Sequence, residues 1–259
     1  EYKSIYRGRV QNREVDIDMM PMYMLSFEPY NNGVQRYQAF DSDVERLNAK
    51  KGSQHKLYVN CSRQSLDTLQ IQRVFAMVDT LTARIEGTST VRNITGKGQQ
   101  QLLAFLMLRS VAYASLQNYD AAATDMTTYL EMDSTLSLAW WQRAVCQSLY
   151  TMALDNSQMK QLKIAQIKDD FAHALRLNPQ SAYLYYDRAN FYAKQKDYSR
   201  AIDDYTRALQ IDGHLAEAYY NRGVIRIMAN DRKNGISDLS KAGELGLYEA
   251  YSIIKRYSK

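Results

Sequence analysis

The feature that most constrains this chain is an internal repeat with a fixed period of 34 residues. The stretch AYLYYDRANFYAKQKDYSRAIDDYTRALQIDG starts at Ala182, and a related stretch starts 34 residues later at Ala216. Earlier stretches that start at Leu103 and Ser137 continue the same frame, and they are also 34 residues apart. A fixed period of this length indicates a stack of supersecondary units, each of which buries its apolar face against its neighbours.

Each copy carries bulky and small residues at fixed places. When every copy is numbered from its first residue, positions 4 and 24 are mostly bulky, and positions 8, 20 and 27 are mostly small. In the third copy these residues are Tyr185, Tyr205, Ala189, Ala201 and Ala208. Small residues let two helices approach closely, and bulky residues fill the spaces between them. Polar turn residues such as KQKDY separate two helical patterns, so each copy is predicted to be a helix–turn–helix hairpin.

This 34-residue helix–turn–helix pattern resembles the tetratricopeptide repeat family. The resemblance covers four copies, at residues 103–136, 137–181, 182–215 and 216–249, and the second copy carries 11 extra residues. It implies a mainly α fold, an α-α superhelical solenoid of helical hairpins. The amphipathic stretch at residues 250–259 is expected to be a C-terminal capping helix, because the last repeat of a solenoid otherwise exposes an apolar face.

The extra residues of the second copy, around TMALDNSQMKQ, allow two interpretations. Eleven residues are about three helical turns, so they could lengthen both helices of this copy into a ridge. They could equally form a tolerated surface loop. We favour the loop.

The first part of the chain follows a different pattern. Alternating apolar residues in REVDIDM, and the β-favouring stretches MYMLSFEP and KLYVNC, predict a small N-terminal β element within residues 1–65. A helix is expected next, from about Leu66 to Glu86, as half of a degenerate repeat. The polar stretch GTSTVRNITGKGQQ predicts a linker that completes the region 66–102. In the degenerate repeat, positions 20, 24 and 27 would be Ala76, Thr80 and Ala83.

One cation and one anion recur in every copy. Position 7 is arginine and position 23 is aspartate in all four copies. Because the aspartates recur with the arginines, we expect a structural ladder of ion pairs between packed helices, which would fix their register. The alternative is a row of arginines that binds acidic ligands. The predicted ladder residues are Arg109, Arg143, Arg188, Arg222, Asp125, Asp170, Asp204 and Asp238.

The resemblance also implies a binding surface. In tetratricopeptide arrays the first helices line a concave groove, to which positions 2, 5 and 9 contribute. In this chain those positions are mostly aromatic or aliphatic, and aromatic side chains on a rigid scaffold suit a peptide or a partner helix. The alternative is that a flanking segment or upstream repeats cover some of them. The predicted groove residues are Met107, Val111, Leu138, Trp141, Val145, Tyr183, Tyr186, Asn190, Tyr220 and Val224.

No motif for catalysis or for a cofactor accompanies the repeats. ITGKGQQ lacks the GxxxxGK[ST] pattern of phosphate loops, and the sequence contains neither GxSxG nor HExxH. The histidines show no ligand spacing, and Cys61 and Cys146 are far apart in sequence, so we expect two buried thiols while a disulfide stays open. The sequence therefore predicts no enzyme, no cofactor and no metal site.

Charge and hydropathy restrict the partner. Residues 1–102 carry 14 Lys and Arg against 11 Asp and Glu, and residues 103–259 carry 19 against 17, so the net charge of +5 is spread along the chain. Nucleic-acid-binding proteins usually concentrate positive charge on one face, which argues against a nucleic-acid partner. No run approaches the 18 or so consecutive apolar residues of a membrane span.

The sequence thus predicts a non-enzymatic scaffold that binds a peptide or a partner protein in the groove. A structural or oligomerisation module, which packs on its own upstream repeats or forms a homodimer, is the alternative, and single-stranded nucleic-acid binding is a third hypothesis. RGRVQNREVDID ahead of the repeats also resembles exported repeat proteins of gut bacteria. That resemblance implies a periplasmic or cell-envelope location and further residues upstream.

Overall fold

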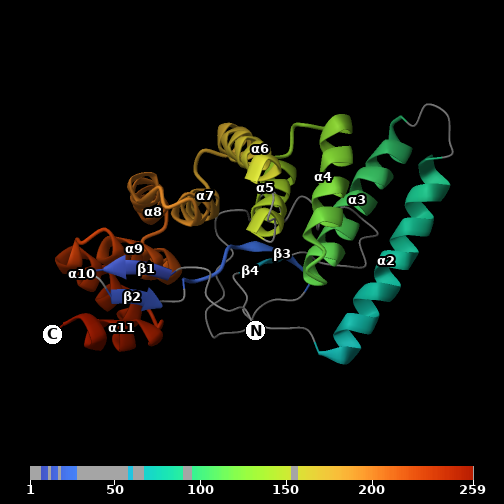
Figure 1. Cartoon of the computed structure of the whole chain (residues 1–259). Coiled ribbons are helices and arrows are strands. Elements are labelled where there is room, and N and C mark those ends of the chain that lie inside the picture. Colours follow the sequence, from blue (N-terminus) through green and yellow to red (C-terminus); the bar gives the residue numbers. More distant parts are fainter. Residues whose placement is uncertain are drawn as a thin grey trace. The chain divides into compact units, whose positions relative to one another are not determined.

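The computed structural model describes residues 7–10, 13–16, 19–27, 58–60, 67–89, 95–152 and 157–258. They form a mainly α fold of successive helical hairpins with short strands near the N-terminus, as the repeat pattern predicts (Figure 1). The chain divides into two compact units. One comprises Glu1–Met22 together with Gln180–Lys259, and the other comprises Tyr23–Pro179. His55, Cys61 and residues 90–94 of the predicted linker lie outside the described residues.

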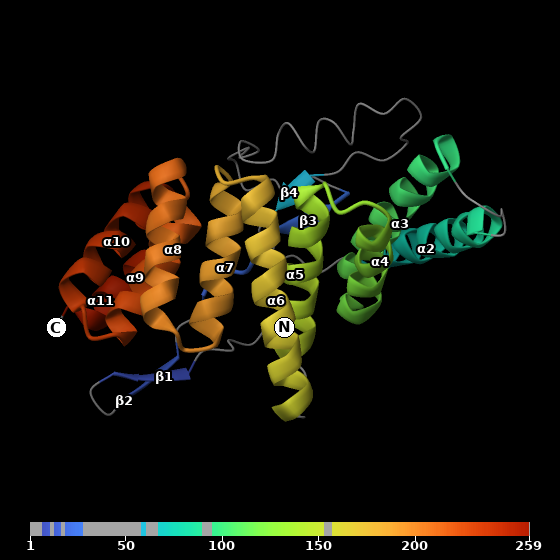
Figure 2. The ribbon, with the colours of Figure 1, turned by 90° about the horizontal axis from the view of Figure 1, so that it is seen from above.

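The unit Tyr23–Pro179 contains two hairpins and one further helix. Helix α2 (Thr68–Ser89) packs on α3 (Lys97–Ser115), which forms the first hairpin with α4 (Tyr119–Met132). Helices α5 (Ser137–Met152) and α6 (Ser157–Leu177) form the second hairpin. Strand β3 (Met24–Ser26) pairs antiparallel with β4 (Tyr58–Asn60), and β3 lies against α3 and α5 (Figure 2). This pairing confirms the predicted strand near residue 60, whereas residues 7–10 and 13–16 form a separate two-stranded sheet.

The other unit contains the third and fourth hairpins. They are α7 (Ala182–Lys194) with α8 (Tyr198–Ile211) and α9 (Ala216–Met228) with α10 (Arg232–Glu244). Strands β1 (Arg7–Val10) and β2 (Arg13–Asp16) form an antiparallel hairpin, and β1 contacts α9. Helix α11 (Glu249–Tyr257) packs on α10, where Ala250 and Ile253 join the core cluster of Leu239 and Ala242. This helix therefore covers apolar residues of the fourth copy.

The turns inside three of the hairpins share one geometry. Gln117, Lys196 and Asn230 have φ near +60°, at 60°, 61° and 67°, and all three occupy position 15 of their copies. The next residue in each copy is Asn118, Asp197 or Asp231, whose side chain accepts a hydrogen bond from the backbone three residues later. Such side chains satisfy amides that the helix start leaves unpaired. The polar turn letters of the sequence thus end one helix and begin the next.

Small residues at positions 8 and 20 set how closely the helices of a hairpin approach. In the fourth copy both are glycine, and a Cβ added to Gly235 would lie 2.7 Å from Cγ1 of Ile227 and 2.8 Å from the backbone oxygen of Gly223. In the first copy the hydroxyl of Ser110 donates a hydrogen bond to the backbone oxygen of Ala122, at 2.9 Å. At this crossing the backbone of one helix therefore directly contacts the backbone or a side chain of the other helix.

The extra residues of the second copy lengthen its helices. Helices α5 and α6 have 16 and 21 residues, whereas α7 and α8 of the next copy have 13 and 14. Residues 151–152 continue α5 and residues 157–161 begin α6, and the four residues between them lie outside the described part. The loop that we favoured is therefore wrong for the described residues, because most of the insertion extends helices that were already present.

The sequence also misplaced the packed face of α2 and the start of α3. Ala76, Thr80 and Ala83 are exposed, whereas α2 buries one face against α3. The misassignment arose because isolated small residues recur by chance on a surface that faces solvent. Helix α3 begins at Lys97, so the last part of the predicted linker is helical. The buried face of α2 consists of Val74, Val78, Leu81 and Ile85.

We predict that Gly235→Ala destabilises the fold. The new methyl group would overlap Ile227 and the backbone of α9, and overpacking of this kind costs about 1–3 kcal/mol, more than the helix propensity of about 1 kcal/mol that alanine gains over glycine. Gly87→Ala in α2 is the matched control, because its Cβ would meet nothing within 4 Å and should leave stability equal or higher. Urea unfolding of both variants measures the difference. Equal midpoints would show that the two helices can separate freely.

Candidate interaction site

The arginine and aspartate of each copy form a bidentate ion pair. Nη2 of each arginine donates to Oδ1 of its aspartate, and Nε donates to Oδ2 of the same carboxylate, as in the pair of Arg143 and Asp170, where the N–O distances are 2.6 and 2.8 Å. Each pair joins the first and second helices of one hairpin. The four pairs are Arg109–Asp125, Arg143–Asp170, Arg188–Asp204 and Arg222–Asp238.

Three of these arginines also reach the preceding helix. Nη1 of Arg109, Arg143 and Arg222 donates to a threonine hydroxyl at 3.1, 3.4 and 3.0 Å respectively. Those threonines are Thr82 of α2, Thr127 of α4 and Thr206 of α8. The pairs therefore link neighbouring hairpins as well as the helices within one, and α2 occupies the place of a second helix relative to α3.

Burial limits what the ion pairs contribute to stability. It raises the pKa of Asp125, Asp170 and Asp204 above the usual range, and the hydrogen bonds from the paired arginines oppose this shift. Removing a charge from water offsets much of the attraction in such pairs, whereas removing one partner leaves a buried charge alone. The geometry accordingly favours a role in fixing helix register. Each of these four guanidinium groups uses two of its N–H groups to bind an aspartate of the same chain.

Aromatic residues flank the same guanidinium groups. The Arg188 guanidinium carbon lies 5.6 Å from the ring centre of Tyr185 and 5.9 Å from that of Tyr192. Arg222 lies 5.6 Å from the ring centre of Tyr219, and Arg143 lies 5.1 Å from that of Trp140. Cation–π contacts of this kind are worth about 0.5–1 kcal/mol at exposed sites. The interleaved tyrosines and arginines of the third copy thus contact one another within the fold.

The predicted groove residues are buried. All ten, from Met107 on α3 to Val224 on α9, are 4% exposed or less. Their burial agrees with the alternative that a flanking segment covers some of them, and their role in binding a partner stays a prediction. In the unit of Glu1–Met22 and Gln180–Lys259, part of the cover is the chain's own residues 19–22, which we call the covering segment.

Asn221 of α9 binds the main chain of the covering segment. The N–H of Met20 donates to Oδ1 of Asn221 at 2.7 Å, and Nδ2 of Asn221 donates to the carbonyl oxygen of Met20 at 3.0 Å. One side-chain amide thus satisfies both polar groups of one backbone residue. Asn221 and Met20 are 0% and 6% exposed, so these bonds form away from solvent.

A hydrogen-bonded cluster on α7 and α8 holds Asn221 in place. The hydroxyl of Tyr186 donates to the carbonyl oxygen of Pro21 at 2.9 Å and lies 3.2 Å from that of Met20. Nδ2 of Asn221 lies 3.0 Å from this hydroxyl and 2.8 Å from Oδ1 of Asn190, which also accepts a hydrogen bond from Tyr205. Two predicted groove residues, Tyr186 and Asn190, therefore belong to a polar centre that binds backbone.

Apolar side chains complete the docking of the covering segment. Met20 belongs to one core cluster with Tyr220, Val224, Ile227 and Leu239. Burying a methionine side chain contributes about 1.5–3 kcal/mol. Methionine is unbranched and fills irregular gaps, so this contact selects an apolar residue without demanding one shape. The segment is thus held by main-chain hydrogen bonds and by two buried side chains, Met20 and Met22, which are 6% and 5% exposed.

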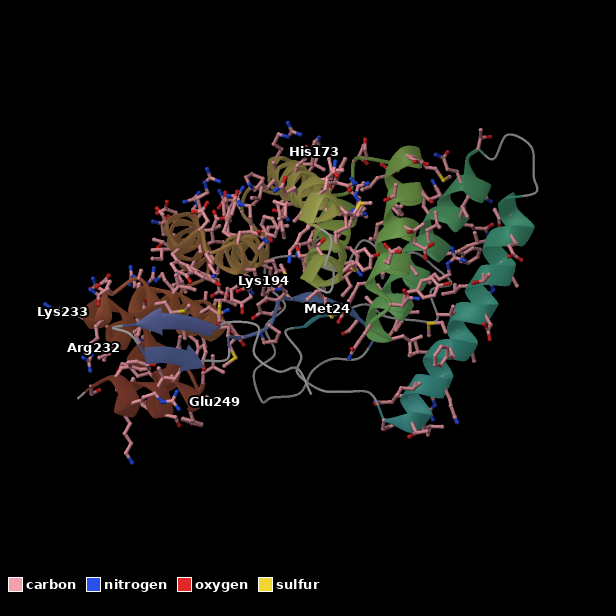
Figure 3. The ribbon with its side chains drawn as sticks, in the orientation of Figure 1. Met24, His173, Lys194, Arg232, Lys233 and Glu249 are labelled. Carbon is pink, nitrogen blue, oxygen red and sulfur yellow. The ribbon has the colours of Figure 1, made fainter. Side chains whose placement is uncertain are left out.

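Lys194 is the last residue of α7 (Figure 3). Its Nζ is 3.6 Å from the sulfur of Met22. Burial lowers the pKa of Lys194 to about 8, and the charge of Asp187 opposes the shift. Because the charged amine is disfavoured under the segment, docking should strengthen as pH rises from 8 towards 10.5, the ordinary value.

Sequence reasoning missed position 6 of the repeat. This position is Leu108, Gln142, Asp187 and Asn221 in the four copies, so three successive copies place a polar residue on an otherwise apolar helix face. The recurrence of a polar residue at this position could have been recognised from the sequence alone. Gln142 is 0% exposed, and neither of its amide atoms has a hydrogen-bond partner within the described structure. Gln142 therefore has the chemistry of Asn221, but no backbone group among the described residues binds it.

Residues 24–27 pack on helices of the unit Tyr23–Pro179. Met24 contacts a cluster that includes Ala114 and Cys146, and Phe27 contacts a cluster that includes Val74 and Val78. Cys146 is a free, buried thiol, as predicted, and burial raises its pKa to about 12. Met24 and Phe27 therefore pack on clusters that combine residues of α2, α3, α4 and α5.

The described residues contain neither a candidate metal site nor a candidate membrane span. Among the described residues, no three His, Cys, Asp or Glu side chains gather as metal ligands would. Within the same residues, no helix has both the length and the apolarity that crossing a membrane requires. The polar centre around Asn221 is thus the candidate site with the clearest chemistry.

Comparison with known proteins identifies the repeat. Residues 182–215 match the sequence model of the tetratricopeptide repeat. The structure resembles that of MamA, with a TM-score of 0.55 and 16% identity over 72% of this chain and 98% of MamA. It also resembles TTC0263, a thermophilic TPR protein in Thermus thermophilus, with a TM-score of 0.53 and 14% identity over 73% and 93% of the two chains. No curated protein gives a significant sequence match.

We predict that two apolar substitutions at position 6 have opposite effects. Gln142→Met should stabilise the fold, because an unpaired buried polar group costs about 1–3 kcal/mol. Asn221→Leu should destabilise it by a similar amount, because it leaves the polar groups of Met20 unpaired. Urea midpoints of the two variants provide the measurement. A loss of stability in Gln142→Met would mean that this amide is paired in solution.

We also predict that the pKa of Lys194 reports the covering segment. Met22→Gly should raise this pKa from about 8 towards 10.5, because the side chain that covers the amine is removed. Met22→Leu is the control, since leucine keeps an apolar cover and should leave the value low. Titration of the lysine side-chain NMR signals measures both. An unchanged value in Met22→Gly would show that the helices alone bury the amine.

Proposed function

Because residues 182–215 are a tetratricopeptide repeat within a chain of that fold, we propose that this protein is a non-enzymatic interaction scaffold. Its site is the face of α7 and α9, and its ligand is an extended segment of a partner protein. The observation that supports this is the docking of the chain's own residues 20–22 on Tyr186 and Asn221. This face already binds one extended segment, which is part of the same chain.

The chemistry of the face suits a polypeptide ligand. Main-chain N–H and C=O groups recur in every peptide, and Asn221 supplies one acceptor and one donor for them. The surrounding aromatic residues Tyr186 and Tyr220 are rigid and buried, as the central residues of protein interfaces are. Partner binding would follow release of the covering segment, which occupies the same atoms.

The second candidate function is a structural module whose own segment fills the face permanently. Burial of all ten predicted groove residues favours it, because a permanently covered face needs no partner. The two functions differ in one property: a scaffold exchanges the covering segment for another chain, and a structural module does not.

Binding of a peptide in trans tests the scaffold. In the full chain with Met20→Pro, residue 20 has no N–H to donate to Oδ1 of Asn221, so the covering segment should dock weakly. A fluorescent peptide of residues 19–27, MMPMYMLSF, should bind this variant at least about 10-fold more tightly than the unaltered chain, because a tethered segment competes at an effective concentration on the order of millimolar.

A scrambled peptide of the same composition is the matched control for non-specific hydrophobic binding. The pKa of Lys194, which should rise towards 10.5 when Met22 no longer covers the amine, provides the check that Met20→Pro has released the segment. If the segment is released and the native peptide binds no better than the scrambled one, the structural module is the correct function. If Met20→Pro unfolds the unit, the same conclusion follows, because the segment is then part of the core.

A further inference from the structure

Helix α6 begins earlier than the second helices of the other hairpins. Helices α4, α8 and α10 each begin three residues before position 20 of their copies, whereas α6 begins at Ser157, ten residues before Ile167 at that position. Residues 157–163, which we call the α6 extension, therefore add about 10 Å of helix. In Figure 2 the ends of α5 and α6 at their turn project beyond the turn of the α3–α4 hairpin.

Large apolar side chains are exposed on the α6 extension. Met159 and Leu162 are 49% and 65% exposed, and Ala165 in the next turn is exposed as well. Because residues three apart are neighbours on a helix surface, these three form one continuous stripe, which we call the α6 stripe. Among the described residues of the other second helices, α4, α8 and α10, no large apolar side chain is exposed. The α6 stripe is thus specific to the second copy.

Lysines flank the α6 stripe on both sides. With about 100° between successive residues of a helix, Lys163 follows Met159 on one side of the stripe, and Lys168 follows Ala165 on the other. Residues 157–168 contain Lys160 besides these two, and they contain no aspartate or glutamate. Exposed cations of α8 and α10 have an acidic partner three residues away, whereas the described part of the chain shows no ion pair of these three lysines.

We propose that the α6 stripe is a second interaction surface and that its partner is an acidic amphipathic helix. An apolar stripe with cations on both sides is complementary to a helix whose own apolar stripe has carboxylates along its edges. Met159 and Leu162 insert between side chains of the partner, and Ala165 lets the two helices approach closely. The surface belongs to the unit Tyr23–Pro179 and uses no residue of the site on α7 and α9, so the proposal goes beyond the scaffold function.

Charge and side-chain type argue against the other occupants of such a surface. Two copies of this chain that met through their α6 stripes would bring lysines against lysines, which is repulsive. Helices that lie in a membrane interface carry a strongly apolar face with tryptophan, phenylalanine or leucine, whereas this stripe has one methionine, one leucine and one alanine. Single-stranded nucleic acid stacks its bases on aromatic side chains, and the stripe contains none.

Binding of three synthetic helices to the full chain tests the proposal. The probe is a fluorescent peptide of three EALEAEL repeats that a hydrocarbon staple holds helical, and the controls replace every glutamate by glutamine or by lysine. Fluorescence anisotropy measures the affinities. We expect the glutamate peptide to bind at least about 10-fold more tightly than the glutamine peptide, and the lysine peptide to bind more weakly than either. Added salt should weaken binding of the glutamate peptide, because it screens exposed charges.

Two charge variants locate the surface. Lys163→Gln together with Lys168→Gln should weaken binding of the glutamate peptide at least about 5-fold, because it removes the cations on both sides of the stripe. The matched control is Lys233→Gln together with Lys255→Gln, which removes two exposed lysines of α10 and α11 and changes the net charge equally. This control should change binding less than about 2-fold, because those charges lie outside the stripe and are screened.

Two leucine variants test the apolar contact. Leu162→Ser should weaken binding of the glutamate peptide at least about 5-fold, because the leucine loses its burial against the partner. Leu177→Ser is the control, since Leu177 is a second exposed leucine of α6, outside the stripe and 47% exposed. It should change binding less than about 2-fold. If the double lysine variant fails to fold, the comparison of the two leucine variants still decides the matter.

The outcomes that overturn the proposal differ from one another. If the glutamate and glutamine peptides bind equally, the lysines do not select the partner. If the stripe variants and their controls lose the same affinity, the peptide binds elsewhere. If phosphatidylserine vesicles or a single-stranded DNA oligonucleotide bind through Leu162 and Lys163 while the glutamate peptide does not, the partner is not an acidic helix. Each of these results leaves the site on α7 and α9 untouched, so the scaffold function is judged separately.

Discussion

The close approach of two helices in each hairpin is the constraint on which the other features depend. At positions 8 and 20 the fourth copy has glycines whose added Cβ atoms would lie under 3 Å from neighbouring atoms. This spacing brings the arginine of one helix within bidentate reach of the aspartate on the other, as in Arg222 and Asp238. The ion pair in turn fixes the rotation of each first helix about its own axis. With the arginine held on one side of the helix, the residues on the opposite side are determined as well. Asn221 points to the covering segment for that reason.

The repeat architecture could be predicted from the sequence, because a period reports packing that is repeated in every copy. Small residues at helix crossings and polar turn residues such as Asp197 each have one physical role. This role is the same in every copy, so the residue type recurs at the same position of the repeat. Other features belong to one copy alone. An insertion of 11 residues is about three helical turns, so it preserves the helical phase on both sides and its letters do not distinguish a loop from longer helices. The structure resolves the choice through α6.

The candidate site was predictable only in part, because periodicity reports that a face is buried and not what buries it. Tyr186 and Tyr220 belong to a row that suits an open binding groove and a covered core equally well, since both need apolar, rigid side chains. What covers them is a segment about 165 to 200 residues earlier in the chain, and no local pattern connects the two. Position 6 was the available signal, because a polar residue such as Asn221 on a buried face must find a partner.

The covering segment is bound in a way that permits exchange. Its hydrogen bonds to Asn221 and Tyr186 involve main-chain atoms, which any incoming chain also carries, so a competitor can replace each bond as it is lost. A net hydrogen bond contributes about 1 kcal/mol, whereas ordering the backbone of one residue costs about 1–2 kcal/mol. The hydrogen bonds alone therefore do not hold the segment, and the burial of Met20 tips the balance. A ligand gains an advantage over the tethered segment chiefly through its apolar side chains, because the main-chain bonds are common to both.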